Sequence, residues 1–146
     1  MERRGFLKSA CALCGLAIIP TALIESCSKQ SYAGPSNVNF TLDLTNAANV
    51  ALTQTGGSLI SNGVIVIRES ASVFTALSAT CTHQGCQVGY DSGVKHLICP
   101  CHGGTYDING NVISGPPPSA LTVYTATLVG NILTVKSKSK TAIVLP

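Results

Sequence analysis

Two short motifs rich in Cys and His constrain this chain more than any other feature of its sequence. They are "CTHQGC" at residues 81–86 and "CPCHGG" at residues 99–104. Together they hold four of the seven cysteines and two of the three histidines in the 146-residue chain. Thiols and imidazoles are common ligands of zinc, copper and iron, and cysteines in an oxidising compartment also form disulfides. The motif residues are therefore metal ligands, disulfide partners, or both.

Three familiar kinds of site account for these motifs less well than a mixed iron–sulfur cluster does. Disulfides alone leave the His in each motif unexplained. Structural zinc sites usually take a pair of Cys followed by a pair of His, whereas here each motif offers a Cys and a His at short spacing. Blue copper needs two His, one Cys and a weak axial ligand. A Rieske [2Fe–2S] cluster places two Cys on one iron and two His on the other, and the motifs can supply that set.

The two motifs closely resemble the cluster-binding boxes of the Rieske iron–sulfur protein family. The resemblance extends through "TYD" to the proline-rich "GPPPS" and covers residues 79–135. It implies one [2Fe–2S] cluster per chain, with Cys81 and Cys99 on the inner iron. His83 and His102 would then bind the outer iron, near the surface.

Other residues of the motifs acquire expected roles from the same resemblance. It implies a disulfide between Cys86 and Cys101, a pair that cytosolic Rieske ferredoxins lack. Tyr106 stands where a tyrosine hydroxyl usually donates to a ligand sulfur. Gly104 stands where high-potential members have a serine that donates to a bridging sulfide. We therefore expect a lower potential here, and a higher one after Gly104→Ser. His96 is expected to be an exposed strand residue that binds no metal.

Two histidine ligands would give the cluster a distinctive chemistry. Imidazole is neutral whereas thiolate is negative, so the cluster accepts an electron more readily than an all-Cys one. Rieske centres span about −150 to +300 mV, against about −400 mV for plant-type ferredoxins. Reduction adds negative charge and so raises the proton affinity of the imidazoles. This coupling of electron and proton suits the oxidation of a quinol.

The remaining pattern predicts an all-β domain. Charged residues make up only 10% of the chain, its net charge is +3, and no basic stripe indicates a nucleic-acid partner. Short apolar runs alternate with Gly, Asn and Pro, and tight turns are predicted at Asn62-Gly63, Asn109-Gly110 and Gly130-Asn131. No segment after residue 37 has helical periodicity. We expect a small antiparallel sandwich or barrel, the Rieske fold, in which two loops form a cluster-binding subdomain.

The N-terminus predicts export. "MERRGFLK" is a charged start, an uncharged run follows at 9–24, and "RRGFLK" resembles the twin-arginine signal that exports folded proteins. "IESC" resembles a lipobox, with lipidation at Cys27; cleavage after "SYA" and an uncleaved anchor are the alternatives. The expected organisation is an export signal at 1–26, a polar linker at 27–37 and the Rieske domain at 38–146.

The sequence thus predicts an exported Rieske [2Fe–2S] electron-transfer protein with no independent catalytic site. It would lie at the outer face of the cytoplasmic membrane, in the periplasm, or lipid-anchored in the cell envelope. The first expected role is the iron–sulfur subunit of a quinol-oxidising complex, with a cytochrome b or c as redox partner. The alternatives are a small subunit of a molybdenum oxidoreductase such as arsenite oxidase, and a freestanding lipid-anchored carrier.

Overall fold

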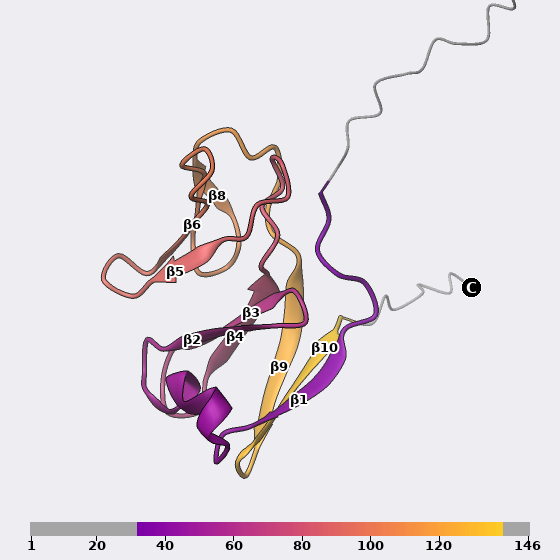
Figure 1. The fold of residues 1–146 in the computed structure, drawn as a ribbon, viewed down its shortest axis with the longest axis vertical. Coiled ribbons are helices and arrows are strands. Elements are labelled where there is room, and N and C mark those ends of the chain that lie inside the picture. Colours follow the sequence, from indigo (N-terminus) through magenta and orange to yellow (C-terminus); the bar gives the residue numbers. More distant parts are fainter. Residues whose placement is uncertain (1–31, 139–146) are drawn as a thin grey trace, which may run out of the picture. The chain divides into compact units, whose positions relative to one another are not determined.

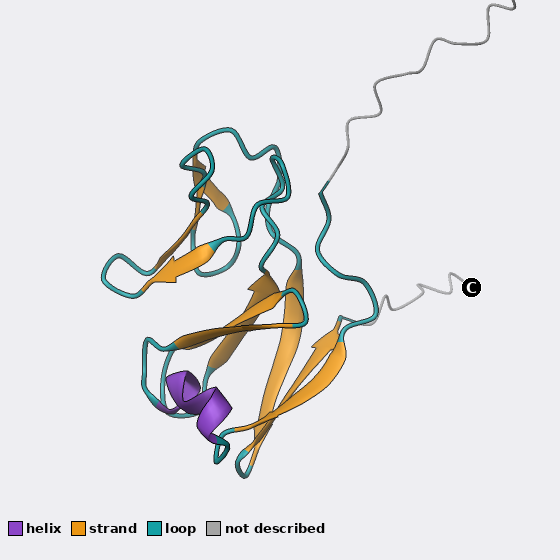
Figure 2. Ribbon diagram, in the orientation of Figure 1, coloured by secondary structure: helices purple, strands orange, loops and turns teal. Residues whose placement is uncertain are grey.

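The computed structural model describes residues 32–138, and it consists of two antiparallel sheets (Figures 1 and 2). The predicted export signal and Cys27 lie outside the described residues. The larger sheet has the strand order β1-β10-β9-β4-β3-β2 and curls into a half-barrel. Its strands are β1 (Asn39–Asp43), β2 (Ser58–Ser61), β3 (Val64–Arg68), β4 (Phe74–Ser78), β9 (Val123–Val129) and β10 (Ile132–Ser137). The prediction of a small all-β antiparallel fold is confirmed.

The smaller sheet carries the two motifs and has the order β5-β6-β7-β8. Its strands are β5 (Gly89–Asp91), β6 (His96–Ile98), β7 (Thr105–Tyr106) and β8 (Val112–Ser114). Leu97 and Tyr106 are cross-strand partners and are both fully buried, so one face of this sheet faces the core. His96 lies on β6 as predicted, opposite Asp91, but it is half-buried and not exposed as expected.

Strand β3 separates two hydrophobic cores. Its residues 64–67 are an unbroken apolar run, and each is at most 1% exposed. Val64 and Val66 point into the core of the larger sheet. Ile65 and Ile67 point the other way, into a core shared with the smaller sheet. Because side chains alternate between the faces of a strand, a strand covered on both faces needs such a continuous run.

The turns between strands follow the sequence closely. Asn62 and Gly63 both have positive φ, 51° and 74°, as a type I′ turn requires, and they join β2 to β3. Gly130-Asn131 joins β9 to β10. The Asn109-Gly110 turn is organised by Asp107, whose carboxylate accepts hydrogen bonds from the backbone N–H groups of Asn109 and Asn111.

One short helix was not predicted. Asn46 caps the N-terminus of the 3-10 helix η1 (Ala47–Thr53), because its side chain accepts a hydrogen bond from the backbone N–H of Ala48. Only Leu52 of this helix is buried, so the sequence has no helical periodicity to detect. The Arg68 guanidinium holds the helix in place by donating to the carbonyl of Leu52 at 2.9 Å. Within residues 32–138, no helix is long and apolar enough to cross a membrane.

Residues 32–37, part of the expected linker, lie along the domain. The Tyr124 hydroxyl donates to the carbonyl of Pro35 at 2.7 Å. The ring of Tyr32 covers Gly85 so closely that a methyl group on Gly85 would lie 2.7 Å from its Cδ1. This segment therefore reaches from the larger sheet to the first Cys/His motif.

Candidate metal centre

The two motifs form loops with the same backbone closure. In motif loop 1 (81–86), the N–H of Cys81 donates to the carbonyl of Cys86, and the N–H of Gly85 donates back to the carbonyl of Cys81. In motif loop 2 (99–104), Cys99 is closed in the same way by residues 103 and 104, at 3.0 and 2.8 Å. Gly85 and Gly103 occupy corresponding positions, and both have positive φ. The two loops therefore share one backbone conformation, although the order of Cys and His differs between the motifs.

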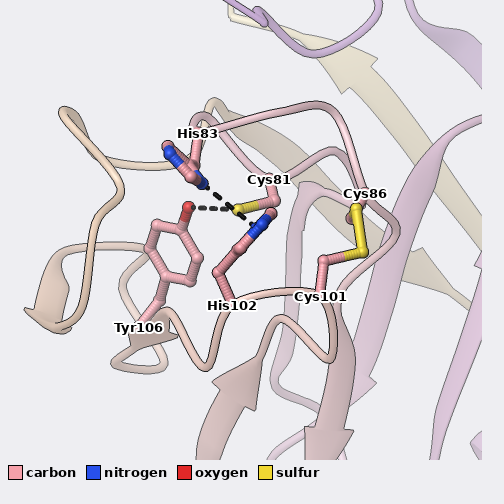
Figure 3. Close-up of a disulfide and its surroundings, with 6 residues drawn as sticks. All are labelled: Cys81, His83, Cys86, Cys101, His102 and Tyr106. Atoms are coloured by element: carbon pink, nitrogen blue, oxygen red, sulfur yellow. Dashed lines mark hydrogen bonds between the residues drawn. A yellow bond between two sulfur atoms is a disulfide. The ribbon is translucent and has the colours of Figure 1, made fainter.

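The four predicted ligands lie on these loops, and Figure 3 shows Cys81, His83 and His102 pointing toward one another. Cys81 and Cys99 are free thiols and only 1% exposed. His83 is half-buried and His102 is exposed. The Nδ1 atoms of the two imidazoles lie 3.3 Å apart, with the rings nearly perpendicular at 86°. Two sulfur donors therefore lie inside the domain and two nitrogen donors lie at its surface.

A disulfide joins the two loops. Cys86 and Cys101 are bonded, with their Cα atoms 6.5 Å apart (Figure 3). The Sγ of Cys99 lies within 4.8 Å of both disulfide sulfurs. Those two sulfurs are oxidised, and only Cys99 of the three remains a thiol. The bridge therefore ties loop 1 to loop 2 beside one predicted ligand without using any of the four.

Tyr106 connects the inner side of the site to the proline loop, residues 115–119. Its hydroxyl oxygen lies 3.3 Å from the Sγ of Cys81 and accepts a hydrogen bond from the N–H of Thr82 at 3.2 Å. The Thr82 hydroxyl lies 3.2 Å from the same oxygen and donates to the carbonyl of Ser119 at 2.7 Å. Sequence reasoning missed Thr82, although its position between two predicted ligands is a signal.

The two buried thiols differ in acidity. Burial raises the pKa of Cys81, but hydrogen bonds from the Tyr106 hydroxyl and the His83 N–H outweigh it, so this pKa lies below its ordinary value. Burial, followed by the neighbouring Cys81 sulfur, raises the pKa of Cys99 above its ordinary value. Two thiolates that lie close enough to share a hydrogen bond repel each other. A cation between them would therefore stabilise the doubly ionised state.

The structure revises the expectation for Gly104. Its backbone does not lie in the left-handed region, so its φ does not exclude a serine. The obstacle is space, because a Cβ on Gly104 would lie 2.5 Å from Cγ and 2.9 Å from Cδ of Pro117. Pro117 is buried, and its ring is rigid. A serine does not fit here unless the proline loop moves, and sequence reasoning did not detect this contact.

The donor set fits a [2Fe–2S] cluster with mixed ligation. Two buried cysteines, as thiolates, would hold one iron, and the facing Nδ1 atoms of two imidazoles would hold the other. The thiols lie in the core and the imidazoles lie at the surface, so the sulfur donors and the nitrogen donors are on opposite sides of the site. A bound cluster supplies reversible one-electron chemistry. The chain's own contribution is to exclude water from the sulfurs and to expose the imidazoles.

Comparison with known sequences identifies related proteins. A family model described as the Rieske [2Fe-2S] domain matches residues 41–125, more than half of the chain. The cytochrome b6-f complex iron-sulfur subunit of Prochlorococcus marinus (strain AS9601) is 46% identical over 65 residues, covering 44% of this chain and 36% of that protein. The protein of the same name from Chlorobaculum thiosulfatiphilum is 43% identical over 68 residues, covering 47% and 37%. Each match spans well under two thirds of the relative's own length.

Solved structures show the same fold. The cyanobacterial plasma membrane Rieske protein of Synechocystis PCC 6803 aligns with a TM-score of 0.51 and 28% identity, over 70% of this chain and 100% of that one. A chain from the complex of reduced oxygenase and oxidized ferredoxin in carbazole 1,9a-dioxygenase aligns with a TM-score of 0.53 and 23% identity, over 72% and 98%. Because the family match takes in both motif loops and the strands that carry them, this chain belongs to the Rieske [2Fe–2S] family and is an electron-transfer protein that binds a [2Fe–2S] cluster.

Proposed function

We propose that Cys81 and Cys99 bind the inner iron of the cluster and that His83 and His102 bind the outer iron. The support is their convergence from two loops, with the thiols buried and the Nδ1 atoms 3.3 Å apart. The buried side of this site receives hydrogen bonds from Tyr106 and from backbone N–H groups, which stabilise negative charge on sulfur.

The proposed role is that of an exported iron–sulfur subunit in a quinol-oxidising complex. The observation that carries it is the pair of imidazoles at the surface of a disulfide-bridged site. An exposed imidazole can accept a hydrogen bond from a quinol and then take up its proton, which a buried all-Cys site cannot do. The similarity to cytochrome b6-f iron-sulfur subunits supports the same role.

Export and membrane attachment complete the proposal. The Cys86–Cys101 disulfide suits an oxidising compartment, in agreement with the twin-arginine-like start at residues 1–26. Lipidation at Cys27 would hold the Rieske domain of residues 38–146 at the outer face of the membrane. Cys27→Ser should then move the protein from the membrane fraction to the soluble one. Cys14→Ser is the matched control, because residue 14 lies within the predicted signal and should have no effect.

Isolation of the protein from its native membranes tests the proposed role. Mild detergent should recover it with a haem-b-containing partner, and added quinol should reduce the cluster in that complex. Recovery with a molybdenum-containing subunit and no haem would instead favour the oxidoreductase alternative. Recovery of the protein alone, with its cluster not reduced by quinol in membranes, would favour a freestanding carrier.

A further inference from the structure

Three sulfur atoms lie together where the two motif loops meet. The Sγ atoms of Cys86, Cys99 and Cys101 are all within 4.8 Å of one another, and two of them form the disulfide between the loops. The third belongs to Cys99, a thiol that is only 1% exposed. A thiol exchanges with a disulfide by attacking one of its sulfurs, and the rate depends on access to that sulfur. Cys99 therefore lies beside a group with which it can react.

The two sulfurs of the disulfide are not equivalent targets. Cys86 packs against the hydrophobic core that contains Cys99, whereas Cys101 is exposed. Attack on Cys86 releases the sulfur of Cys101, and water can stabilise the charge on that leaving group. Attack on Cys101 would instead close a ring around Pro100 alone, whose φ is fixed. Both differences favour Cys86 as the target.

We propose that Cys99 exchanges with the disulfide when it is not held by the cluster. A bond forms between the Sγ atoms of Cys99 and Cys86, and the bond between Cys86 and Cys101 breaks. The electron pair of the broken bond stays on the sulfur of Cys101, which takes up the proton that Cys99 gives up. One disulfide and one thiol are present before and after the step, so no oxidant or reductant is consumed. The product still joins the two loops.

The exchange would prevent the chain from taking up its cluster again. A metal binds the thiolate of a cysteine, and the sulfur of Cys99 would lie in a disulfide. Cys81 would then be the one thiol left for the inner iron, until an added thiol reversed the exchange. This consequence rests on the proposed ligand role of Cys99, whereas the exchange itself rests on the three neighbouring sulfurs.

The experiment starts from the full-length, cluster-loaded protein. A chelator removes the iron under anaerobic conditions at constant pH. Samples taken over time are alkylated in acidic denaturant, and their labels and disulfides are mapped by non-reducing mass spectrometry. Within the motif loops, the label should first appear on Cys81 and Cys99, and it should then move from Cys99 to Cys101 at a rate that dilution does not change. Reloading with iron and sulfide should fail in parallel and recover after treatment with dithiothreitol.

Cys81→Ser and Cys99→Ser form a matched pair, because each loses one proposed ligand and keeps one thiol of the proposed centre. Cys81→Ser should carry a bridge between Cys86 and Cys99 with a free thiol at Cys101, whereas Cys99→Ser should keep the original bridge. The original bridge in Cys81→Ser, or throughout the time course of the wild type, would overturn the proposal. A rate of exchange that falls on dilution would overturn it as well.

The ligand assignment is tested separately in the same samples. Before the chelator is added, Cys99 should resist alkylation under native conditions as long as the iron stays bound. Labelling of Cys99 in protein that retains its iron would contradict its ligand role. The two serine variants would still decide whether the exchange occurs, so the failure of one proposal is distinguishable from the failure of the other.

Discussion

The Nδ1 atoms of His83 and His102 lie 3.3 Å apart although 19 positions separate the two residues in the sequence. Each comes from a different motif loop, and the Cys86–Cys101 disulfide holds those loops together. Neither imidazole is buried, so the nitrogen side of the proposed centre is the side that a redox partner can reach.

Replacing either imidazole should abolish the cluster. His83→Ala and His102→Ala each remove a proposed iron ligand. The one imidazole that remains cannot fill both nitrogen positions on the outer iron. Metal analysis should fall from about two irons per chain towards none, and the EPR signal with a low g-average should disappear. His96→Ala is the control, since His96 lies on β6 outside the motif loops and should keep a full complement of iron. A variant at His83 or His102 with an unchanged spectrum would contradict the assignment.

Removing the disulfide should weaken the fold as well as the centre. The bridge closes a segment of 15 residues, which corresponds to about 3 kcal/mol in the chain-entropy model. Cys86→Ser with Cys101→Ser should reduce the free energy of unfolding in urea by about that amount. Non-reducing mass spectrometry should first show that the wild type carries the bridge. An unchanged unfolding midpoint in the double variant would show that the hydrophobic contacts between the loops suffice.

Tyr106→Phe should lower the reduction potential. It removes the hydroxyl that lies 3.3 Å from Cys81 Sγ and leaves the buried N–H of Thr82 without its partner. A hydrogen bond to a charged group contributes about 1.5–3 kcal/mol, and only the difference between redox states changes the potential. At about 59 mV per tenfold for one electron, we expect a fall of tens of millivolts. Tyr124→Phe, which loses a hydroxyl bonded to Pro35, should leave the potential unchanged.

Asp107 should make stability depend on pH on the acid side. Burial raises its pKa, but hydrogen bonds from Asn111 and Asn109 outweigh burial and lower it below the ordinary 3.8. The folded state therefore binds this proton less readily than the unfolded chain does. Its contribution is complete above the ordinary pKa and is lost as pH falls through the folded value. Unfolding at successive pH values should show a shallower acid loss in Asp107→Asn, and parallel curves would refute this role.

The segment before β1 should be docked in solution. Tyr32→Trp introduces the only tryptophan of the chain, at the position that covers Gly85. Its fluorescence should be poorly accessible to iodide. Val129→Trp is the matched control, because Val129 is 72% exposed at the turn between β9 and β10. Equal quenching of the two tryptophans would show that residues 32–37 move freely.

The parts of the fold that local patterns specify could be predicted from the sequence. Asn62 and Gly63 can adopt positive φ, so the β2–β3 hairpin follows from two adjacent residues. The helix η1 could not be predicted, because a seven-residue helix with one buried side chain leaves no periodic signal. The Gly104–Pro117 contact joins two loops whose paths depend on the whole domain. The pattern of residue types therefore cannot reveal that the Pro117 ring occupies the space beside Gly104.

The burial of β3 on both faces links the electron-transfer centre to the stability of the entire domain. Ile65 and Ile67 belong to the same hydrophobic core as Cys81 and Cys99. If the motif loops opened, the face of β3 that packs against them would be exposed to water. The two sheets should therefore unfold as one cooperative unit. Free energy gained when the iron–sulfur cluster binds is then also folding free energy for the larger sheet. Loss of iron should therefore lower the stability of the larger sheet, although its strands carry none of the proposed ligands.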